Sequence, residues 1–251
     1  MSTAGARPIR RILDRVLVSG TVEDVVPVAR HMRRIRIGGA SLRDLDWTPG
    51  QHVRLQVGDL LSPQIWLRGF RDLLRTYSIW DYDPRGSLDL CILDHAEAGP
   101  GALWSRQASI GRHVAFTRPE GRFVPRGDAP YHLFVGDETA EVAFGAMLRA
   151  LPGSARAYGA VAVGGPDDRL PLSRSDELTW VYRDSASPAD TDLLVHAVRS
   201  LALPDHPGVA YVAGQARTCQ AVREHLVRER GWPRDAVLVK AFWAPGKRGL
   251  D

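Results

Sequence analysis

The chain has 251 residues, of which 44% are hydrophobic and 25% are charged, so disordered and fibrous proteins are excluded and one large core or two smaller ones can form. Its 33 lysines and arginines are interspersed with 29 acidic residues, and the small net charge of +4 argues against a nucleic-acid partner. No apolar run approaches the length of a membrane span, and the first residues lack the apolar core of a secretory signal, so we expect a cytoplasmic protein without stable membrane association.

The first half of the chain is predicted to form a β-barrel. Short apolar or alternating runs are separated by turns rich in glycine, proline and aspartate, a pattern typical of antiparallel strands. Six strands are expected, at residues 16–26, 31–37, 52–57, 76–80, 88–93 and 113–117. This number of short strands predicts a closed or nearly closed antiparallel barrel.

In the second half, strands alternate with helices, which predicts an α/β domain with a parallel sheet and helices on both faces. We place the domain boundary so that the barrel occupies residues 1–127 and the α/β domain occupies residues 128–251. Strands are expected at residues 131–135, 157–163, 178–182, 209–213 and 237–242, and helices at 140–151, at 192–203 and in a last segment that ends at Gly231.

Metal and disulfide chemistry are not indicated. Cys91 and Cys219 stand far apart in apolar stretches, where buried structural cysteines are expected. The eight histidines show no paired spacing, so no metal site is predicted.

Residues 75–78 in the barrel half read RTYS and suit a flat, phosphorylated ligand. The Arg75 fork can bind a phosphate, Tyr77 on the same strand face can stack on a flat ring, and the Ser78 hydroxyl can bind a ring nitrogen. A surface arginine beside a core tyrosine would give the same pattern.

A turn at Gly99-Pro100-Gly101 leads into a short helical stretch and can present backbone N–H groups to a pyrophosphate. His95 and Trp104 flank this turn. They could equally be an ordinary histidine at a strand end and a core tryptophan.

Two turns in the α/β half follow strands, where parallel sheets bind ligands. The first is Gly136-Asp137-Glu138-Thr139-Ala140, and the second is Gly214-Gln215-Ala216. Asp137 and Thr139 could also be plain helix caps. Neither GxGxxG nor a P-loop is present, so no standard dinucleotide fingerprint is assigned.

Taken in order, these segments resemble the siderophore-interacting proteins, a family of flavin-dependent ferric-siderophore reductases within the ferredoxin-reductase-like flavoproteins. The resemblance rests on RTYS, DHAEAGPGxxW, GDETA, LTWVYR, AGQA and AFWxPGK, and it extends from about residue 22 to residue 248. The order of the set is more specific than any single motif.

The resemblance implies that the barrel binds FAD. Arg75 would hold the FAD phosphate, Tyr77 would pack on the isoalloxazine, and Ser78 would lie near flavin N5 as the catalytic residue. The remaining residues of this implied FAD site are Thr76, His95, Gly99, Pro100, Gly101 and Trp104.

The same resemblance implies that the α/β domain receives a reduced nicotinamide. Its implied cofactor contacts are Gly136, Asp137, Glu138, Thr139, Ala140, Gly214, Gln215, Ala216 and Trp243. A basic rim of Arg54, Lys240, Lys247 and Arg248 would attract an anionic ferric siderophore.

The implied reaction is hydride transfer from NADH or NADPH to FAD, followed by single electrons to siderophore-bound Fe(III) and release of Fe(II). We expect a monomer. Alternatives are a general flavin-dependent oxidoreductase with another acceptor, a non-catalytic flavin- or siderophore-binding protein, and reduced ferredoxin as the donor.

The choice of nicotinamide stays open at this point. Asp167 or Asp168 could favour NADH by binding a ribose 2′-hydroxyl, whereas Arg169, Arg156 or Arg183 could favour NADPH.

Three positions depart from the family pattern. Ala102 stands where a serine is usual, and Phe242 replaces a tyrosine. Glu120 stands at a usual arginine position, between Arg118 and Arg122.

Overall fold

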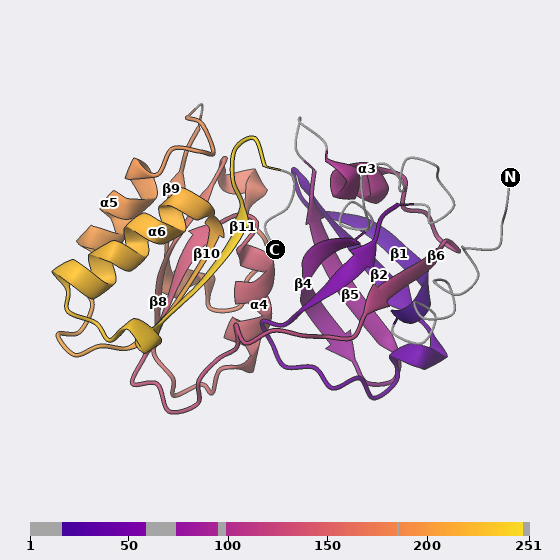
Figure 1. Ribbon diagram of the computed structural model, residues 1–251, viewed down its shortest axis with the longest axis horizontal. Coiled ribbons are helices and arrows are strands. Elements are labelled where there is room, and N and C mark those ends of the chain that lie inside the picture. The colour runs from indigo at the N-terminus through magenta and orange to yellow at the C-terminus, as the bar shows by residue number, and fades with distance from the viewer. Residues whose placement is uncertain (1–16, 59–73, 95–98, 185, 248–251) are drawn as a thin grey trace, which may run out of the picture. The chain divides into compact units, whose positions relative to one another are not determined.

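The computed structural model describes residues 17–58, 74–94, 99–184 and 186–247, which form two compact units (Figure 1). The first unit contains the chain up to Pro27 and the range Arg33–Gly121. The second contains the segment Val28–Met32 and the chain from Arg122 onward. The short segment Val28–Met32 therefore belongs with the second unit, although the chain before and after it belongs to the first.

The first unit is a closed six-stranded antiparallel barrel, which confirms the predicted fold of this half. Around the barrel the strand order is β1-β2-β5-β4-β3-β6, and β1 closes the ring by pairing with β6. A short helix, α3 (Pro100–Arg106), follows β5. The strands are β1 (Leu17–Ala29), β2 (Met32–Gly38), β3 (His52–Gln56), β4 (Leu74–Asp83), β5 (Ser87–Leu93) and β6 (His113–Thr117).

The barrel interior is filled by alternate residues of its strands. On β3, Val53 and Leu55 are fully buried while Arg54 between them is exposed. Phe116 of β6 and Trp104 of α3 belong to the same core. Burying a large apolar side chain stabilises a fold by about 1.5–3 kcal/mol, so this pattern fixes which strand face points inward.

Strand β4 is longer than the predicted 76–80 because its hairpin with β5 continues as far as Asp83 opposite Ser87. Gly86 makes the turn with a φ of +117°, a conformation that favours glycine.

The second unit contains a five-stranded parallel sheet in the order β11-β10-β7-β8-β9, which confirms the predicted α/β half. Every residue of the central strand β7 is buried, as expected for a parallel strand covered on both faces. The strands are β7 (His132–Asp137), β8 (Ala157–Val163), β9 (Leu178–Tyr182), β10 (Val209–Gln215) and β11 (Val237–Trp243).

Helices cover both faces of the sheet (Figure 1). On one face, α5 and α6 pack on a core that includes Val135, Ala160 and Val212. On the other, Phe144 of α4 makes an edge contact with Phe134 of β7. The helices are α4 (Glu141–Ala150), α5 (Asp192–Ser200) and α6 (Ala216–Glu224), and a π-helical turn at His225–Glu229 continues α6.

Both cysteines are buried, Cys91 in β5 and Cys219 in α6, as the sequence predicts. Within the described part of the chain, none of the helices has the length and apolar character needed to cross a membrane.

Candidate functional site

The RTYS segment lies on β4 next to the start of α3. Arg75 and Tyr77 share one face of the strand, and Gly99 and Pro100 form the turn that begins the helix. A Cβ at Gly101 would lie 1.8 Å from the Tyr77 hydroxyl and 3.7 Å from Arg75 Cγ, so only glycine permits this approach. The structure therefore brings together the arginine, the tyrosine and the turn that the sequence predicts separately.

These residues fit the chemistry of FAD. Tyr77 is half-buried against the barrel core, and burial raises the pKa of its phenol to about 12, so the ring is neutral at physiological pH. Arg75 supplies a cation, and its Nη1 donates a hydrogen bond to the Leu74 carbonyl at 2.8 Å. A neutral ring, a guanidinium and a turn with two glycines suit a flat ring that carries phosphates.

The other residues of the implied FAD site are distributed differently. Ser78 is only 8% exposed, whereas Thr76 is exposed. Trp104 is buried in the barrel core, so packing is its observed role, and a cofactor contact stays a prediction. His95 lies outside the described residues.

Glu120 offsets the positive charge of Arg54. The Arg54 Nε atom lies 2.9 Å from Glu120 Oε1, and both side chains are about half exposed. Backbone hydrogen bonds between Glu120 and His52 fix this arrangement. The residue that departs from the family pattern therefore contacts a predicted substrate-binding arginine, while Arg118 and Arg122 are exposed on either side.

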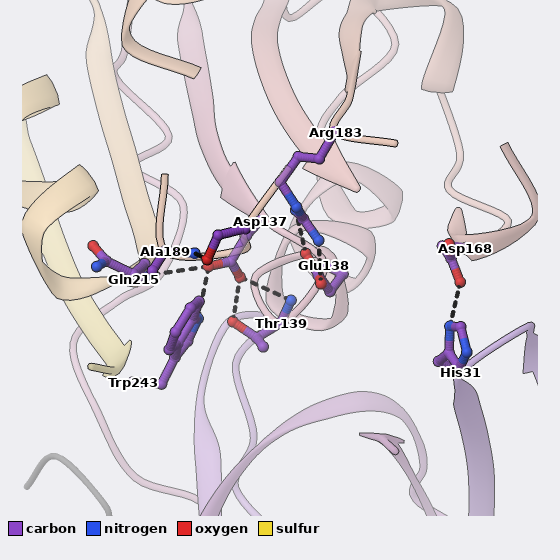
Figure 2. Close-up of polar contacts among 10 residues, drawn as sticks. His31, Asp137, Glu138, Thr139, Asp168, Arg183, Ala189, Gln215 and Trp243 are labelled. Carbon is purple, nitrogen blue, oxygen red and sulfur yellow. Dashed lines mark hydrogen bonds and ion pairs between the residues drawn. The ribbon is translucent and has the colours of Figure 1, made fainter. Parts of the chain in front are cut away.

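In the second unit, the carboxylate of Asp137 links three predicted motifs (Figure 2). Its Oδ1 accepts hydrogen bonds from the Thr139 backbone N–H and hydroxyl. Its Oδ2 accepts from the Gln215 N–H and from Trp243 Nε1, both at 2.8 Å. The GDETA turn, the AGQA turn and the C-terminal aromatic segment therefore meet at one buried carboxylate.

Burial raises the pKa of Asp137, while the hydrogen bonds from Thr139 and Trp243 oppose that shift. Thr139 donates to Asp137 within the turn, but the N-cap of α4 is Ala140 and no side chain caps that helix, so the helix-cap alternative is wrong for both residues. Gln215 and Trp243 are distant in the chain, and no local pattern identifies them as partners of Asp137.

Two glycines make this junction possible. A Cβ at Gly214 would lie 2.4 Å from Asp137 Oδ2, and its φ of +117° also favours glycine. A Cβ at Gly136 would lie 2.5 Å from the Ala140 Cβ, so this glycine lets the strand turn closely into α4. Ala216 begins α6, where the Gln215 side chain accepts a hydrogen bond from Thr218. At Gly136 and Gly214, close internal packing is what requires glycine.

Glu138 forms a two-pronged ion pair with Arg183, which follows β9 (Figure 2). The Arg183 Nη1 and Nη2 atoms lie 2.8 and 2.6 Å from the two carboxylate oxygens. Both side chains are largely buried. The pair ties the carboxyl end of β7 to that of β9.

Sequence reasoning missed a buried carboxyl group in α4. Glu141 is fully buried, and its Oε1 accepts a hydrogen bond from the Leu170 N–H at 2.9 Å. Burial raises its pKa to about 9, so the group is neutral at pH 7. Its place one residue after GDETA would have been the only available signal.

The predicted basic rim is divided between the units, with Arg54 in the first and the lysines in the second. Lys240 lies on β11, 5.6 Å from the centre of the Phe242 ring. Lys247 is exposed in a turn closed by its own N–H and the Ala244 carbonyl. Arg248 lies outside the described residues.

Two family models match the chain, one in each half. Residues 21–123 match the model of the siderophore-interacting FAD-binding domain, and residues 129–246 match the model of the siderophore-interacting protein. An uncharacterized protein of Mycobacterium tuberculosis is 29% identical, with 88% of this chain and 87% of that protein covered. The ferric vibriobactin reductase ViuB of Vibrio cholerae is 28% identical over 69% of this chain and 65% of its own length.

Solved structures share the fold. The siderophore-interacting protein SipS from Aeromonas hydrophila superposes with a TM-score of 0.79 at 25% identity, covering 93% of each chain. A ferredoxin reductase of carbazole 1,9a-dioxygenase gives a TM-score of 0.71 at 18% identity over 90% of this chain and 69% of its own. The second likeness shows the architecture alone, a barrel followed by a parallel sheet.

Proposed function

The chain belongs to the siderophore-interacting protein family, whose two domain models match residues 21–123 and 129–246, and from this we propose that it is a flavin-dependent ferric-siderophore reductase. The observation that carries the proposal is the convergence of Arg75, Tyr77 and Gly101 on one face of the barrel, within a domain of FAD-binding type. The reductase assigned to ferric vibriobactin among its relatives supports the substrate class.

The barrel residues would bind and orient the cofactor. Arg75 would hold an FAD phosphate, with the backbone of the Gly99–Gly101 turn beside it. Tyr77 would pack on the ring, and Ser78 would donate a hydrogen bond near N5. When held by these residues, FAD would supply the redox chemistry: two-electron reduction by NADH or NADPH and one-electron reduction of chelated Fe(III), which is released as Fe(II).

The second unit would receive the nicotinamide nucleotide. The GDETA and AGQA segments include the carboxyl ends of β7 and β10, which are parallel neighbours, so both segments lie at one edge of the sheet. Asp137 would act as a positioning residue, because its hydrogen bonds hold the two turns and Trp243 together.

Basic side chains would attract the ferric chelate. Since Glu120 pairs with Arg54, we assign a larger share of this attraction to the C-terminal segment, where Lys247 is exposed. An anionic or carboxylate-bearing siderophore is the substrate that such a segment would favour.

The proposal is tested by loading the purified protein with FAD and titrating it anaerobically with NADH, NADPH and reduced ferredoxin in separate experiments. We expect a flavin absorbance spectrum that one of these donors bleaches. A protein that takes up no FAD would overturn every flavin-based function. Flavin that no donor bleaches would leave a non-catalytic binding protein instead.

A further inference from the structure

The loop between β8 and β9 contains two aspartates, Asp167 and Asp168, that could bind the ribose hydroxyls of a nucleotide. Both already pair with another side chain. The Arg30 Nη2 atom lies 2.6 Å from Asp167 Oδ2. His31 Nδ1 lies 2.7 Å from Asp168 Oδ1 (Figure 2). Arg30 also donates its backbone N–H to the Asp167 carbonyl at 2.8 Å. Two residues of the segment Val28–Met32, which belongs to the same unit, therefore pair with one oxygen of each aspartate.

The second oxygen of Asp168 is also enclosed. A Cβ at Gly164 would lie 2.7 Å from Asp168 Oδ2, so the carboxylate folds back over its own loop. The Asp168 side chain is only 12% exposed. A carboxylate that recognises the 2′- and 3′-hydroxyls of NADH must present its oxygens to the ribose. Asp168 is largely covered, and Asp167, although its side chain is 72% exposed, has one oxygen paired with Arg30.

Of the three arginines that the sequence suggested for a 2′-phosphate, two are excluded by their positions or partners. Arg183 is committed to Glu138 through both terminal nitrogens. Arg156 directly precedes β8, whereas nucleotides bind at the carboxyl edge of a parallel sheet, about 20 Å away along a seven-residue strand.

Arg169 remains, and it is oriented by aromatic groups. Its guanidinium carbon lies 3.9 Å from the centre of the Trp180 ring, and its Nη1 lies 3.4 Å from the Tyr182 hydroxyl. Tyr182 is 37% exposed at the carboxyl end of β9. No carboxylate pairs with Arg169 within the ranges that the structure describes. The Glu141 carboxyl, whose charge would otherwise offset it, stays protonated at pH 7.

We propose that Arg169 and Tyr182 bind the 2′-phosphate of an adenine nucleotide, so that the protein prefers NADPH to NADH. This inference rests on the proposed function, because it names the electron donor for the same reaction. A guanidinium held flat against an indole loses little freedom when its fork binds a phosphate, and the phenol hydroxyl can donate a further hydrogen bond.

The test measures nucleotide binding by the FAD-loaded full chain with isothermal titration calorimetry, using adenosine 2′,5′-bisphosphate and 5′-AMP as probes. We expect the bisphosphate to bind at least tenfold more tightly. Arg169→Ala should reduce this preference to less than threefold, and Arg169→Lys should give an intermediate value. Arg156→Ala is the matched control and should leave the preference unchanged. Asp167→Asn with Asp168→Asn should not weaken binding of 5′-AMP.

Equal affinity of the wild-type protein for the two probes would overturn the inference. So would a preference that survives in Arg169→Ala, or 5′-AMP binding that depends on the two aspartates. Because the probes transfer no electrons, selective binding of the bisphosphate by a protein whose flavin is bleached by neither dinucleotide nor reduced ferredoxin would defeat the reductase proposal alone. Equal bleaching by NADH and NADPH without that selectivity would defeat only this inference.

Discussion

Asp137 accepts four hydrogen bonds, and its donors come from positions 139, 215 and 243. Burial raises the pKa of Asp137, but both of its oxygens accept hydrogen bonds, which favours the ionised carboxylate. A hydrogen bond to a charged group stabilises a fold by about 1.5–3 kcal/mol, and a buried carboxylate that loses a donor cannot replace it with water. The indole of Trp243 is therefore a structural part of the junction, whatever it contributes to a bound cofactor.

We expect Trp243→Phe to lower the free energy of unfolding by about 1.5–3 kcal/mol, because Asp137 loses one donor while most of the aromatic surface is kept. The matched control is Trp180→Phe, which loses an indole N–H donated to the neutral carbonyl of Ser175. Trp180→Phe should lower the free energy of unfolding by only about 0.5–1.5 kcal/mol. Urea denaturation of both variants checks the difference, and equal losses would contradict a charged acceptor at Asp137.

The buried carboxyl of Glu141 should make the free energy of unfolding depend on pH. Its pKa is about 9 in the folded protein against an ordinary value of 4.5, so the folded chain keeps a proton that the unfolded chain releases. The free energy of unfolding should therefore fall as pH rises from 4.5 to 9, by at most about 1.4 kcal/mol per pH unit from this group. Glu141→Gln keeps an acceptor for Leu170 but does not titrate.

The measurement is urea denaturation of wild type and Glu141→Gln at pH 5, 7 and 9. The free energy of unfolding of Glu141→Gln minus that of the wild type should increase with pH across this series. Parallel curves would mean that the buried carboxyl does not titrate as the structure indicates.

At the scale of elements, the position of α3 against β4 is the feature on which flavin binding depends most. Gly101→Ala would place a methyl group 1.8 Å from the Tyr77 hydroxyl, so either the ring or the helix must move. We expect this variant to purify with a much lower flavin content. Gly99→Ala is the matched control, since a Cβ there would meet nothing within 4 Å, and it should lose much less flavin. Flavin absorbance per protein distinguishes the two variants. Equal flavin content in both would contradict a place for Tyr77 in the flavin site.

The strands and helices could be predicted from the sequence, because period-two alternation and glycine-rich turns are local signals. The barrel strands and the alternating strands and helices follow from them. The contacts between these elements could not be predicted from the sequence. The bond between Trp243 and Asp137 spans 106 positions, and the pairing of His31 with Asp168 spans 137. Such partners are set by strand order in the sheet and by the fold of a distant segment, which periodicity does not encode.

At the scale of the whole molecule, the net charge of +4 hides an uneven distribution of lysine. The only two lysines, Lys240 and Lys247, lie on β11 and in the turn that follows it. Lys247→Glu should weaken the use of anionic ferric chelates several-fold, mainly at low ionic strength, and should leave flavin content unchanged. Rates with an anionic and a neutral chelate at two salt concentrations check this. An equal loss with both chelates would contradict an electrostatic role.

The most direct test of the proposed function is reoxidation of the reduced, FAD-loaded protein by ferric chelates under anaerobic conditions. Hydroxamate, catecholate and carboxylate siderophores are added separately, and flavin absorbance is followed together with an Fe(II)-specific chromogenic chelator. We predict that at least one ferric siderophore restores the flavin absorbance far faster than buffer, with two Fe(II) formed per flavin. Reoxidation no faster than in buffer with every chelate, alongside rapid reoxidation by a quinone or another acceptor, would contradict the account and indicate a general flavin-dependent oxidoreductase.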